Sequence, residues 1–487
     1  MKVRGTFLSG ILVLGLSLSV PATVLRVPSE YPTIQAGIDA AADGDTVLVA
    51  DGTYSGAGNR HLDFGGVNMV VMSENGPAST VIDCEQSGRG FHFHTGENEE
   101  AVVRGFTIEN GYAVGGWIEG CGGAILCNGS SPTIEGNIIR DNTSTWNGGG
   151  ILCYNGFLAM IADNTIVGNV ATRNGGGIIC HSGSAIVRGN IISGNVGGSS
   201  GGGIHYYLSS GSIEGNLIAD NSGGPLGGGI VCSSSSPPIG GNTIVGNMAD
   251  DGGGICWYNS TGTVTNSIVW GNNASTGPQI SGPCTVTYSD VQDGWPGVGN
   301  IDADPLFATG PQGDYYLSQT IAGQPEQSPC VDGGDPDSAV PEGTTRTDEV
   351  CDVWPPDMGY HYYPCTAGPT PLLWVCVTPD TTQVVRGEDL WFSIDVVNVT
   401  DSTLTFDGWV DAYLLNGNPY ARNPALGPVE ITLGGNGGLY GVRRHVRVPM
   451  GAPFGEPYRL CCRTGAHPDS IWVEDCFEFA IVWPPAE

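Results

Sequence analysis

The sequence predicts an all-β chain: a right-handed parallel β-helix, a solenoid of roughly ten coils with an N-terminal capping helix, followed by a small β-sandwich. Three observations predict this fold. A repeat of about 26 residues runs through the middle of the chain, each repeat contains short β-branched runs, and the texture changes after residue 371. Of the 487 residues, 79 are glycine, which is typical of a chain with many tight turns.

The first 22 residues have the pattern of a secretory signal peptide. Lys2 and Arg4 give a positive start, an apolar run extends from Phe7 to Val20, and small residues at Val20–Ala22 offer a cleavage site. This run is shorter than the roughly 20 residues that a membrane span needs. No second long apolar run follows, so we expect secretion and no transmembrane segment.

The charge of the chain restricts its partners. It carries 17 basic and 49 acidic residues, a net charge of −32. Such a surface disfavours nucleic acid and highly anionic polysaccharides, and it leaves neutral glycans, cations and other proteins as partners. The 15 cysteines of an exported chain suggest disulfides, whose pairing the sequence does not give.

The repeat consists of three columns of apolar residues. A glycine-rich block ends in isoleucine at Ile125, Ile151, Ile178, Ile204, Ile230 and Ile255. A second column follows an asparagine by two residues at Ile139, Ile166, Ile192, Ile218, Ile244 and Ile268, and a third lies at Ile134, Ile161, Val187, Ile213 and Ile239. Because no helix-length pattern lies between these runs, each repeat predicts short strands joined by Gly and Asn turns.

Stacking the repeats as coils pairs each strand with its copy about 4.8 Å away and places the isoleucines in interior columns. Asparagines in register, such as Asn137 and Asn164, can pass amide hydrogen bonds from coil to coil and can take left-handed turn conformations. The residue two beyond each glycine-block isoleucine also faces inward, a column that contains Cys127, Cys153, Cys180, Tyr206, Cys232 and Trp257. We expect these thiols to pack as small apolar groups, because in-register parallel pairs make poor disulfide geometry.

The chain divides into four predicted segments. Residues 1–22 are the signal peptide, and residues 23–318 form the β-helix, which begins with an amphipathic capping helix at residues 31–41 and a first strand from Thr46. Residues 319–371 form a closing cap and a linker. Residues 372–487 contain alternating runs separated by turn clusters, the pattern of a β-sandwich. In this last segment, Cys461 or Cys462 could pair with Cys476.

Residues 31–54, YPTIQAGIDAAADGDTVLVADGTY, resemble the N-terminus of bacterial secreted right-handed parallel β-helix repeat proteins in the pectin-lyase-like superfamily. Residues 302–307, 328–336 and 357–360 resemble the closing segment of that group. The resemblance covers about residues 24–363. It implies the fold and a bacterial protein that is secreted or held at the cell surface, and it leaves the activity open. Residues 372–487 are similar to immunoglobulin-like accessory modules of secreted bacterial proteins.

The candidate ligand-binding residues lie on the outward face of the glycine-block strands. The column three residues beyond each isoleucine reads Asn128, Tyr154, His181, Tyr207, Ser233 and Tyr258, and His205 lies in the neighbouring column. We predict that Tyr154, His181, His205, Tyr207 and Tyr258 contact a ligand, because aromatic faces along a rigid ridge suit sugar rings. In pectin-lyase-like enzymes the comparable face often carries substrate. The alternative is ordinary strand decoration, since aromatic residues favour sheets.

Two acidic groups are the other candidate sites. Asp250 and Asp251 resemble the paired aspartates of polygalacturonase-type hydrolases, but the His-Gly pair and Arg-x-Lys of that family are missing, so a solvated turn is the alternative. A loop that carries Asp332, Asp335 and Asp337 could hold calcium or form a plain capping turn. We expect no other cofactor. His92 and His94 share a strand face without zinc-type spacing.

These patterns predict a monomeric extracellular β-helix protein that contacts neutral glycans or extracellular proteins without catalysis. Two alternatives stay open. One is a carbohydrate-active enzyme of the pectin-lyase-like type, a polysaccharide lyase or a glycoside hydrolase. The other is a structural or adhesion protein of the surface.

Overall fold

The computed structural model describes residues 22–156, 158–353, 355–365, 373–381, 383–386, 388–398, 403–414, 425–433, 438–448, 457–466 and 470–482. All but the last residue of the predicted signal peptide therefore lie outside the described residues. The chain forms two compact units, residues 1–366 and 367–487. In the described part of the chain, no helix is long and apolar enough to cross a bilayer.

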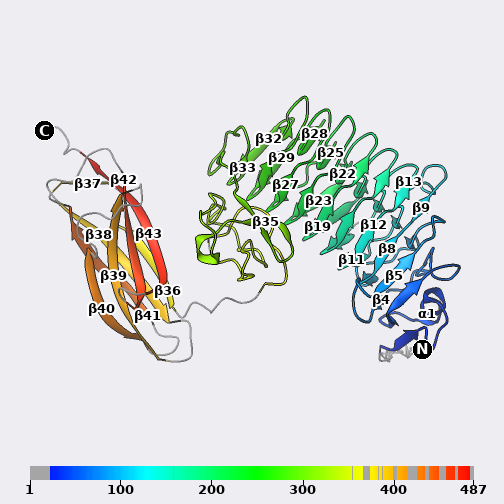
Figure 1. Ribbon diagram of the computed structural model, residues 1–487, viewed down its shortest axis with the longest axis horizontal. Coiled ribbons are helices and arrows are strands. Elements are labelled where there is room, and N and C mark those ends of the chain that lie inside the picture. The colour runs from blue at the N-terminus through cyan, green and yellow to red at the C-terminus, as the bar shows by residue number, and fades with distance from the viewer. Residues whose placement is uncertain are drawn as a thin grey trace, which may run out of the picture. The chain divides into compact units, whose positions relative to one another are not determined.

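The first unit is a parallel β-helix, which confirms the predicted fold class (Figure 1). Its coils share three long parallel sheets. Sheet A contains β1 (Val24–Val27), β2 (Thr46–Val49), β4 (Val70–Ser73), β7 (Val102–Arg104), β11 (Thr133–Glu135), β15 (Met160–Ala162), β19 (Ser184–Arg188), β23 (Ser210–Glu214), β26 (Ile239–Gly240), β29 (Gly262–Thr265) and β32 (Cys284–Thr287). Sheet B contains β3 (Gly52–Tyr54), β5 (Thr80–Asp83), β8 (Thr107–Glu109), β12 (Ile138–Arg140), β16 (Thr165–Val167), β20 (Ile191–Ser193), β24 (Leu217–Ala219), β27 (Thr243–Val245), β30 (Ile268–Trp270) and β33 (Asp290–Val291).

Sheet C carries the glycine-block strands. It contains β6 (Phe91–Phe93), β10 (Ile125–Asn128), β14 (Ile151–Tyr154), β18 (Ile178–His181), β22 (Ile204–Tyr207), β25 (Ile230–Ser233), β28 (Ile255–Tyr258) and β31 (Ile280–Ser281). A short fourth sheet, sheet D, contains β9 (Tyr112–Ala113), β13 (Thr143–Ser144), β17 (Val170–Ala171) and β21 (Val196–Gly197). The register pairs each isoleucine with its copy in the next coil, for example Ile125 with Ile151.

The interior of the coils consists of the predicted columns. All six glycine-block isoleucines are fully buried, as are the isoleucine and valine columns of sheets A and B. The column that contains Cys127, Cys153, Cys180 and Cys232 is buried too, and these four thiols are not in disulfides. The prediction that they pack as apolar core groups is confirmed.

Two asparagine ladders connect the coils. In one of them, Asn169 Nδ2 donates to Asn195 Oδ1 at 3.0 Å, and Asn195 Nδ2 donates to Asn221 Oδ1 at 3.0 Å. The predicted amide ladder is therefore present. The prediction that these asparagines adopt the left-handed conformation is wrong, because the positive φ falls on the residue before each of them, such as Asp163 or Gly194. The asparagine is left free to turn its amide inward.

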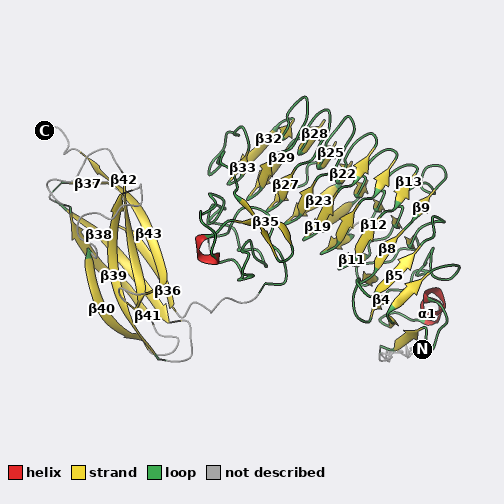
Figure 2. Ribbon diagram, in the orientation of Figure 1, coloured by secondary structure: helices red, strands yellow, loops and turns green. Residues whose placement is uncertain are grey.

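The two ends of the stack are closed by local elements. Helix α1 (Ile34–Ala40) begins at Thr33, whose hydroxyl caps Ala36 N–H, and buries Ile34 and Ile38 against the first coil. Figure 2 shows α1 at the N-terminal end of the stack, as predicted. At the other end, hairpin β34 (Phe307–Gly310) and β35 (Gly313–Leu317), the short helix η1 (Thr320–Ala322) and the chain up to Cys365 cover the outer face of sheet B.

The closing segment is fastened to the coils by specific hydrogen bonds. Tyr360 N–H donates to Thr243 Oγ1 at 2.9 Å, and the Cys330 thiol contacts Asp290 Oδ2 at 3.2 Å. A disulfide joins Cys351 and Cys365 within the segment. Residues as far apart in sequence as Thr243 and Tyr360 therefore stabilise each other.

The second unit is a small β-sandwich. One sheet has the strand order β36 (Leu373–Pro379), β38 (Asp389–Asn398), β41 (Gly438–Arg447). The other has the order β37 (Gln383–Val385), β43 (Ser470–Val482), β42 (Pro457–Ala466), β39 (Leu404–Leu414), β40 (Leu426–Leu433). Both sheets supply core side chains, among them Phe392 and Leu460. Cys461 lies opposite Cys476 in the β42–β43 register and belongs to a disulfide. The side chain of Cys476 lies outside the described residues.

Candidate functional site

Three of the predicted ligand-binding residues form a continuous aromatic row on sheet C. Tyr154, His181 and Tyr207 are register neighbours on consecutive strands, and their ring centres are 5.1 and 4.7 Å apart along the row. The row ends at Ser233, which is buried. Tyr258 is 49% exposed, lies one strand beyond Ser233 and contacts none of the three rings. The predicted ridge is thus divided, and Tyr258 stands apart.

His205 does not point into solvent, which corrects the prediction that its column is exposed. It is 4% exposed. The chain turns back at Gly201, where a Cβ would lie 2.8 Å from the Cβ of His205. The same turn covers the equivalent residue of each coil, so Leu126 and Ile179 are buried as well. The column next to the isoleucine therefore faces away from the interior and is still covered.

His205 belongs to a buried chain of polar groups. Ser200 Oγ donates to Asn174 Oδ1 at 3.1 Å and lies 3.1 Å from His205 Nδ1, and His205 Nε2 lies 3.0 Å from Ser233 Oγ. Asn174 Nδ2 donates to Asn147 Oδ1 at 3.1 Å. These bonds are mutually consistent when His205 Nδ1 carries the proton. Burial lowers the pKa of His205 to about 3, so the ring is neutral.

Three residues outside the predicted column complete the site. Trp117 lies in an insertion, because Phe91 and Ile125 are register partners 34 residues apart while later coils have 25 to 27 residues. Its ring centre lies 5.6 Å from that of Tyr154 and 5.3 Å from that of His181. Sequence analysis missed Trp117 because it follows the repeat, and the lengthened coil was the available signal.

Trp146 and Arg173 come from the turns before β14 and β18. Each lies five residues before its glycine-block isoleucine, so they occupy the same position in consecutive coils. The guanidinium of Arg173 lies over the indole of Trp146, 3.9 Å from its centre. The ring of Trp117 meets Trp146 edge to face at 6.2 Å.

The Trp117 loop is held at both ends. The Arg89 side chain, 7% exposed, donates to the carbonyls of Glu119, Cys121 and Gly122. Trp146 Nε1 donates to the carbonyl of Gly115 at 3.1 Å. A loop with these anchors presents its indole without ordering on contact, which lowers the entropic cost of binding.

The aromatic residues surround a hollow of about 310 Å³. Its lining combines rings, amides and one cation: Trp117, Trp146, Asn147, Arg173, Asn174, Ile179, His181, His205 and Tyr207. The lining residues that the structure describes include no carboxylate. We call this set the aromatic hollow. Ring faces can stack on apolar faces of a ligand while the amides and imidazoles exchange hydrogen bonds with its hydroxyls.

Asp250 and Asp251 lie on a turn before β28, outside the lining of the aromatic hollow. Asp250 is exposed and its carbonyl accepts hydrogen bonds from the N–H groups of Ser275 and Thr276. Asp251 N–H donates to the Pro225 carbonyl at 3.1 Å. The two acids therefore sit in a hydrogen-bonded turn, as the alternative interpretation had it.

The candidate calcium loop is organised by its own backbone. Asp335 accepts from Asp337 N–H at 3.0 Å, and its own N–H donates to Asn266 Oδ1 at 2.7 Å. Asp332 N–H donates to Asp357 Oδ1. Across the described residues, no three His, Cys, Asp or Glu side chains gather in a way that could hold a metal ion. The three aspartates thus fasten the closing segment to the coils.

His92 and His94 lie ring to ring, with centres 4.3 Å apart. His94 Nε2 is 3.1 Å from Asp63 Oδ2. Burial, together with the charge of Arg89, lowers the pKa of His92 to about 4, so this pair is not doubly charged near neutral pH.

The comparison with protein-family models now supplements the geometry. Residues 63–192 match the family model described as "Right handed beta helix region". The matched stretch contains Trp117, Trp146, Tyr154 and His181 and ends before Tyr207. No curated protein matches the chain. The match supports the coil architecture and says nothing about a ligand.

Proposed function

We propose that this chain is an extracellular glycan-binding protein that holds a neutral sugar in the aromatic hollow. The observation that carries the proposal is the convergence of Trp117, Trp146, Tyr154, His181 and Tyr207 around a cavity that also presents amides. Sugar rings have apolar faces and hydroxyl edges, and this combination of ring faces and planar polar groups matches both. The signal-like N-terminus and the resemblance to bacterial secreted β-helix proteins support a location outside the cell.

The charge distribution favours a neutral ligand. The chain carries a net charge of −32, which disfavours the approach of a polyanion. Arg173 is the cation of the hollow, and its guanidinium is stacked on Trp146, where it can donate to hydroxyl groups as well as to an acid. A single arginine does not offset the surrounding field for a ligand with many charges.

Binding is favoured over hydrolysis by the lining itself. Glycoside hydrolysis uses two carboxyl groups on either side of the scissile bond. The described lining of the hollow contains none, and Asp250 and Asp251 lie elsewhere. A carbohydrate-active enzyme is the alternative, and release of reducing sugar from a polysaccharide would support it.

The test is a glycan array probed with the full chain and with two tyrosine variants. Tyr207→Ala removes a ring of the hollow, while Tyr258→Ala removes an exposed tyrosine from the same face outside it. We expect retention of neutral glycans by the parent and by Tyr258→Ala, and loss by Tyr207→Ala. Equal loss in both variants, or no retained glycan, would overturn the proposal.

A further inference from the structure

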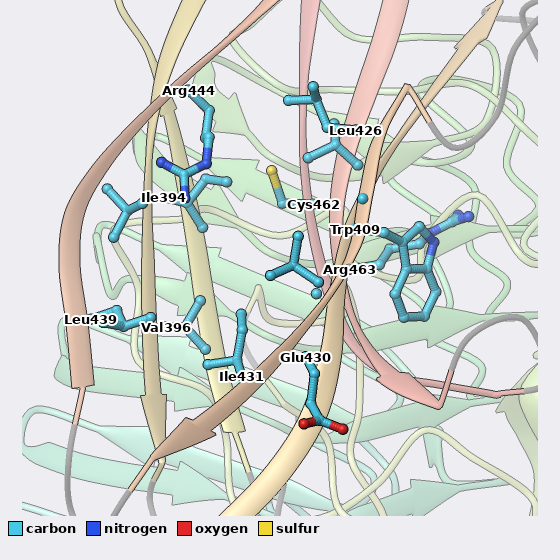
Figure 3. Close-up of a pocket in the computed structure, with 15 residues that line it drawn as sticks. Ile394, Val396, Trp409, Leu426, Glu430, Ile431, Leu439, Arg444, Cys462 and Arg463 are labelled. Carbon is cyan, nitrogen blue, oxygen red and sulfur yellow. The ribbon is translucent and has the colours of Figure 1, made fainter.

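The second unit has an apolar cavity of about 310 Å³ between its two sheets. Figure 3 shows the residues that line it. Strands β38, β39, β40, β41 and β42 all contribute, and the apolar lining includes Ile394, Val396, Val410, Leu426, Ile431 and Val442. A volume at the lower end of the usual range for ligand pockets suits a single acyl chain.

The cavity opens where the sandwich is not closed. β41 is the edge strand of one sheet and β40 is the edge strand of the other. Val429 on β40 is 58% exposed and Leu439 on β41 is 38% exposed, whereas Phe392 and Leu460 deeper in the sandwich are fully buried. Apolar side chains at the mouth are thus left in contact with water, and a ligand that covered them would be stabilised by the hydrophobic effect.

Arg444 lies at one end of this cavity on the core-facing side of β41. Alternation along the strand places it on the same face as Val442, which lines the cavity, and Val446, which packs against the core. Its neighbours Arg443 and Arg447 face the other way and pair with carboxylates, Asp380 and Asp389. Among the residues that the structure describes, no carboxylate forms an ion pair with Arg444.

The cavity is electrostatically polar along its length. Figure 3 shows the guanidinium of Arg444 beside Ile394, and the carboxylate of Glu430 at the opposite end. An anionic head group is attracted to the first end and repelled from the second. A ligand with one acyl chain and one acidic group therefore has a single favoured orientation.

We propose that this cavity binds a fatty acid, with the carboxylate at Arg444 and the acyl chain among the valine, leucine and isoleucine side chains of the two sheets. A carboxylate and a guanidinium form charge-assisted hydrogen bonds, which are the strong class, and the chain buries apolar surface that both partners otherwise expose. The competing role for a core-facing charge on an edge strand is to block pairing with another strand, and the experiment below separates the two.

The test measures binding of octanoate, decanoate and dodecanoate to the full chain by titration calorimetry, with dodecan-1-ol as the neutral probe of the same chain length. We expect binding that tightens with chain length and an alcohol that binds more weakly than the acid. Arg444→Met keeps an unbranched side chain without the charge, and it should weaken dodecanoate about tenfold or more. Glu430→Gln should bind dodecanoate at least as tightly as the parent.

Arg443→Met is the matched control, because this neighbouring arginine faces away from the cavity and should leave the affinity unchanged. Tyr207→Ala, in the first unit, should also leave it unchanged. Circular dichroism checks that each variant is folded. Absence of dodecanoate binding to the parent would overturn the proposal, and so would an affinity that Arg444→Met does not change. Self-association of Arg444→Met at unchanged dodecanoate affinity would assign the residue to edge protection instead.

Discussion

Arg173 and Trp146 occupy the same turn position in consecutive coils, and the guanidinium of one covers the indole of the other at 3.9 Å. Arg173→Gln keeps a polar side chain but removes this cation–π contact. We expect a change in tryptophan fluorescence and a loss of about 0.5–1 kcal/mol in the free energy of unfolding. Arg188→Gln, an exposed arginine on sheet A whose recorded side-chain contact is with Met160, is the control and should change neither.

Arg89 should control the Trp117 loop from beneath. Arg89→Met leaves the carbonyls of Glu119, Cys121 and Gly122 without their donor, at a cost of about 2 kcal/mol or more. We expect faster limited proteolysis within residues 114–121 and weaker glycan retention. Arg104→Met removes an exposed arginine that pairs with Glu135, so its cleavage rate should match that of the parent. A loop that stays protected in Arg89→Met would show that Trp146 alone holds it.

Asn195 lies in the middle of an asparagine ladder. Its side chain accepts from Asn169 and donates to Asn221 and to the Ile166 carbonyl. Asn195→Ala orphans buried groups on both neighbouring coils, and we expect a loss of about 2–4 kcal/mol in chemical denaturation. Asn195→Ser should lose less, because serine replaces asparagine in the other ladder at Ser267. Asn273→Ala, at an exposed position, should be neutral.

Asp357 makes the closing segment sensitive to pH. Burial, and then the charge of Asp352, raises the pKa of Asp357 to about 7, above the value of about 4 for an unfolded chain. A raised pKa means that the folded state holds the proton more tightly. Its stabilising contribution is therefore complete below pH about 4 and is lost as the pH rises through about 7.

The variant Asp357→Asn lacks this titration. We expect its free energy of unfolding to increase relative to that of the parent between pH 4 and pH 8, as measured by denaturation at a series of pH values. Asp290, whose pKa burial raises to about 6, contributes in the same direction in both proteins. Parallel curves for parent and variant would contradict the assignment to Asp357.

The interior thiols should be inert. Burial raises the pKa of Cys127, Cys180 and Cys232 well above the usual value for a thiol, and thiolate is the reactive form. We expect a thiol reagent to modify the half-buried Cys284 first and to reach the column only on unfolding. Mass spectrometry of the labelled peptides follows the order of reaction, and early labelling of Cys180 would contradict it.

Much of the coil architecture could be predicted from the sequence, because a column of identical residues has one physical explanation when it recurs every coil. The isoleucines and the cysteine column were predicted correctly for this reason. The burial of His205 could not be, since it depends on the path of the turn at Gly201. Trp117 lies in the one lengthened coil, where the period no longer assigns a face.

The second unit is less predictable for a similar reason. Alternation places Arg444 on the same face as Val442 and Val446, but only the strand order shows that this face lies at an open edge. The immunoglobulin-like character of this unit stays a prediction. The sequence also could not separate Tyr258 from Tyr207, because the break between them is the single residue Ser233.

The asparagine ladders have a consequence for the length of the molecule. Because each coil offers the next one the same donors and acceptors, a whole repeat can be gained or lost without a new kind of junction. The aromatic hollow occupies the coils up to Tyr207, and the closing segment is fastened near Thr243 and Asp290. Duplication of an intervening repeat would lengthen the spacer between them while both keep their neighbours, so reach and recognition can evolve separately.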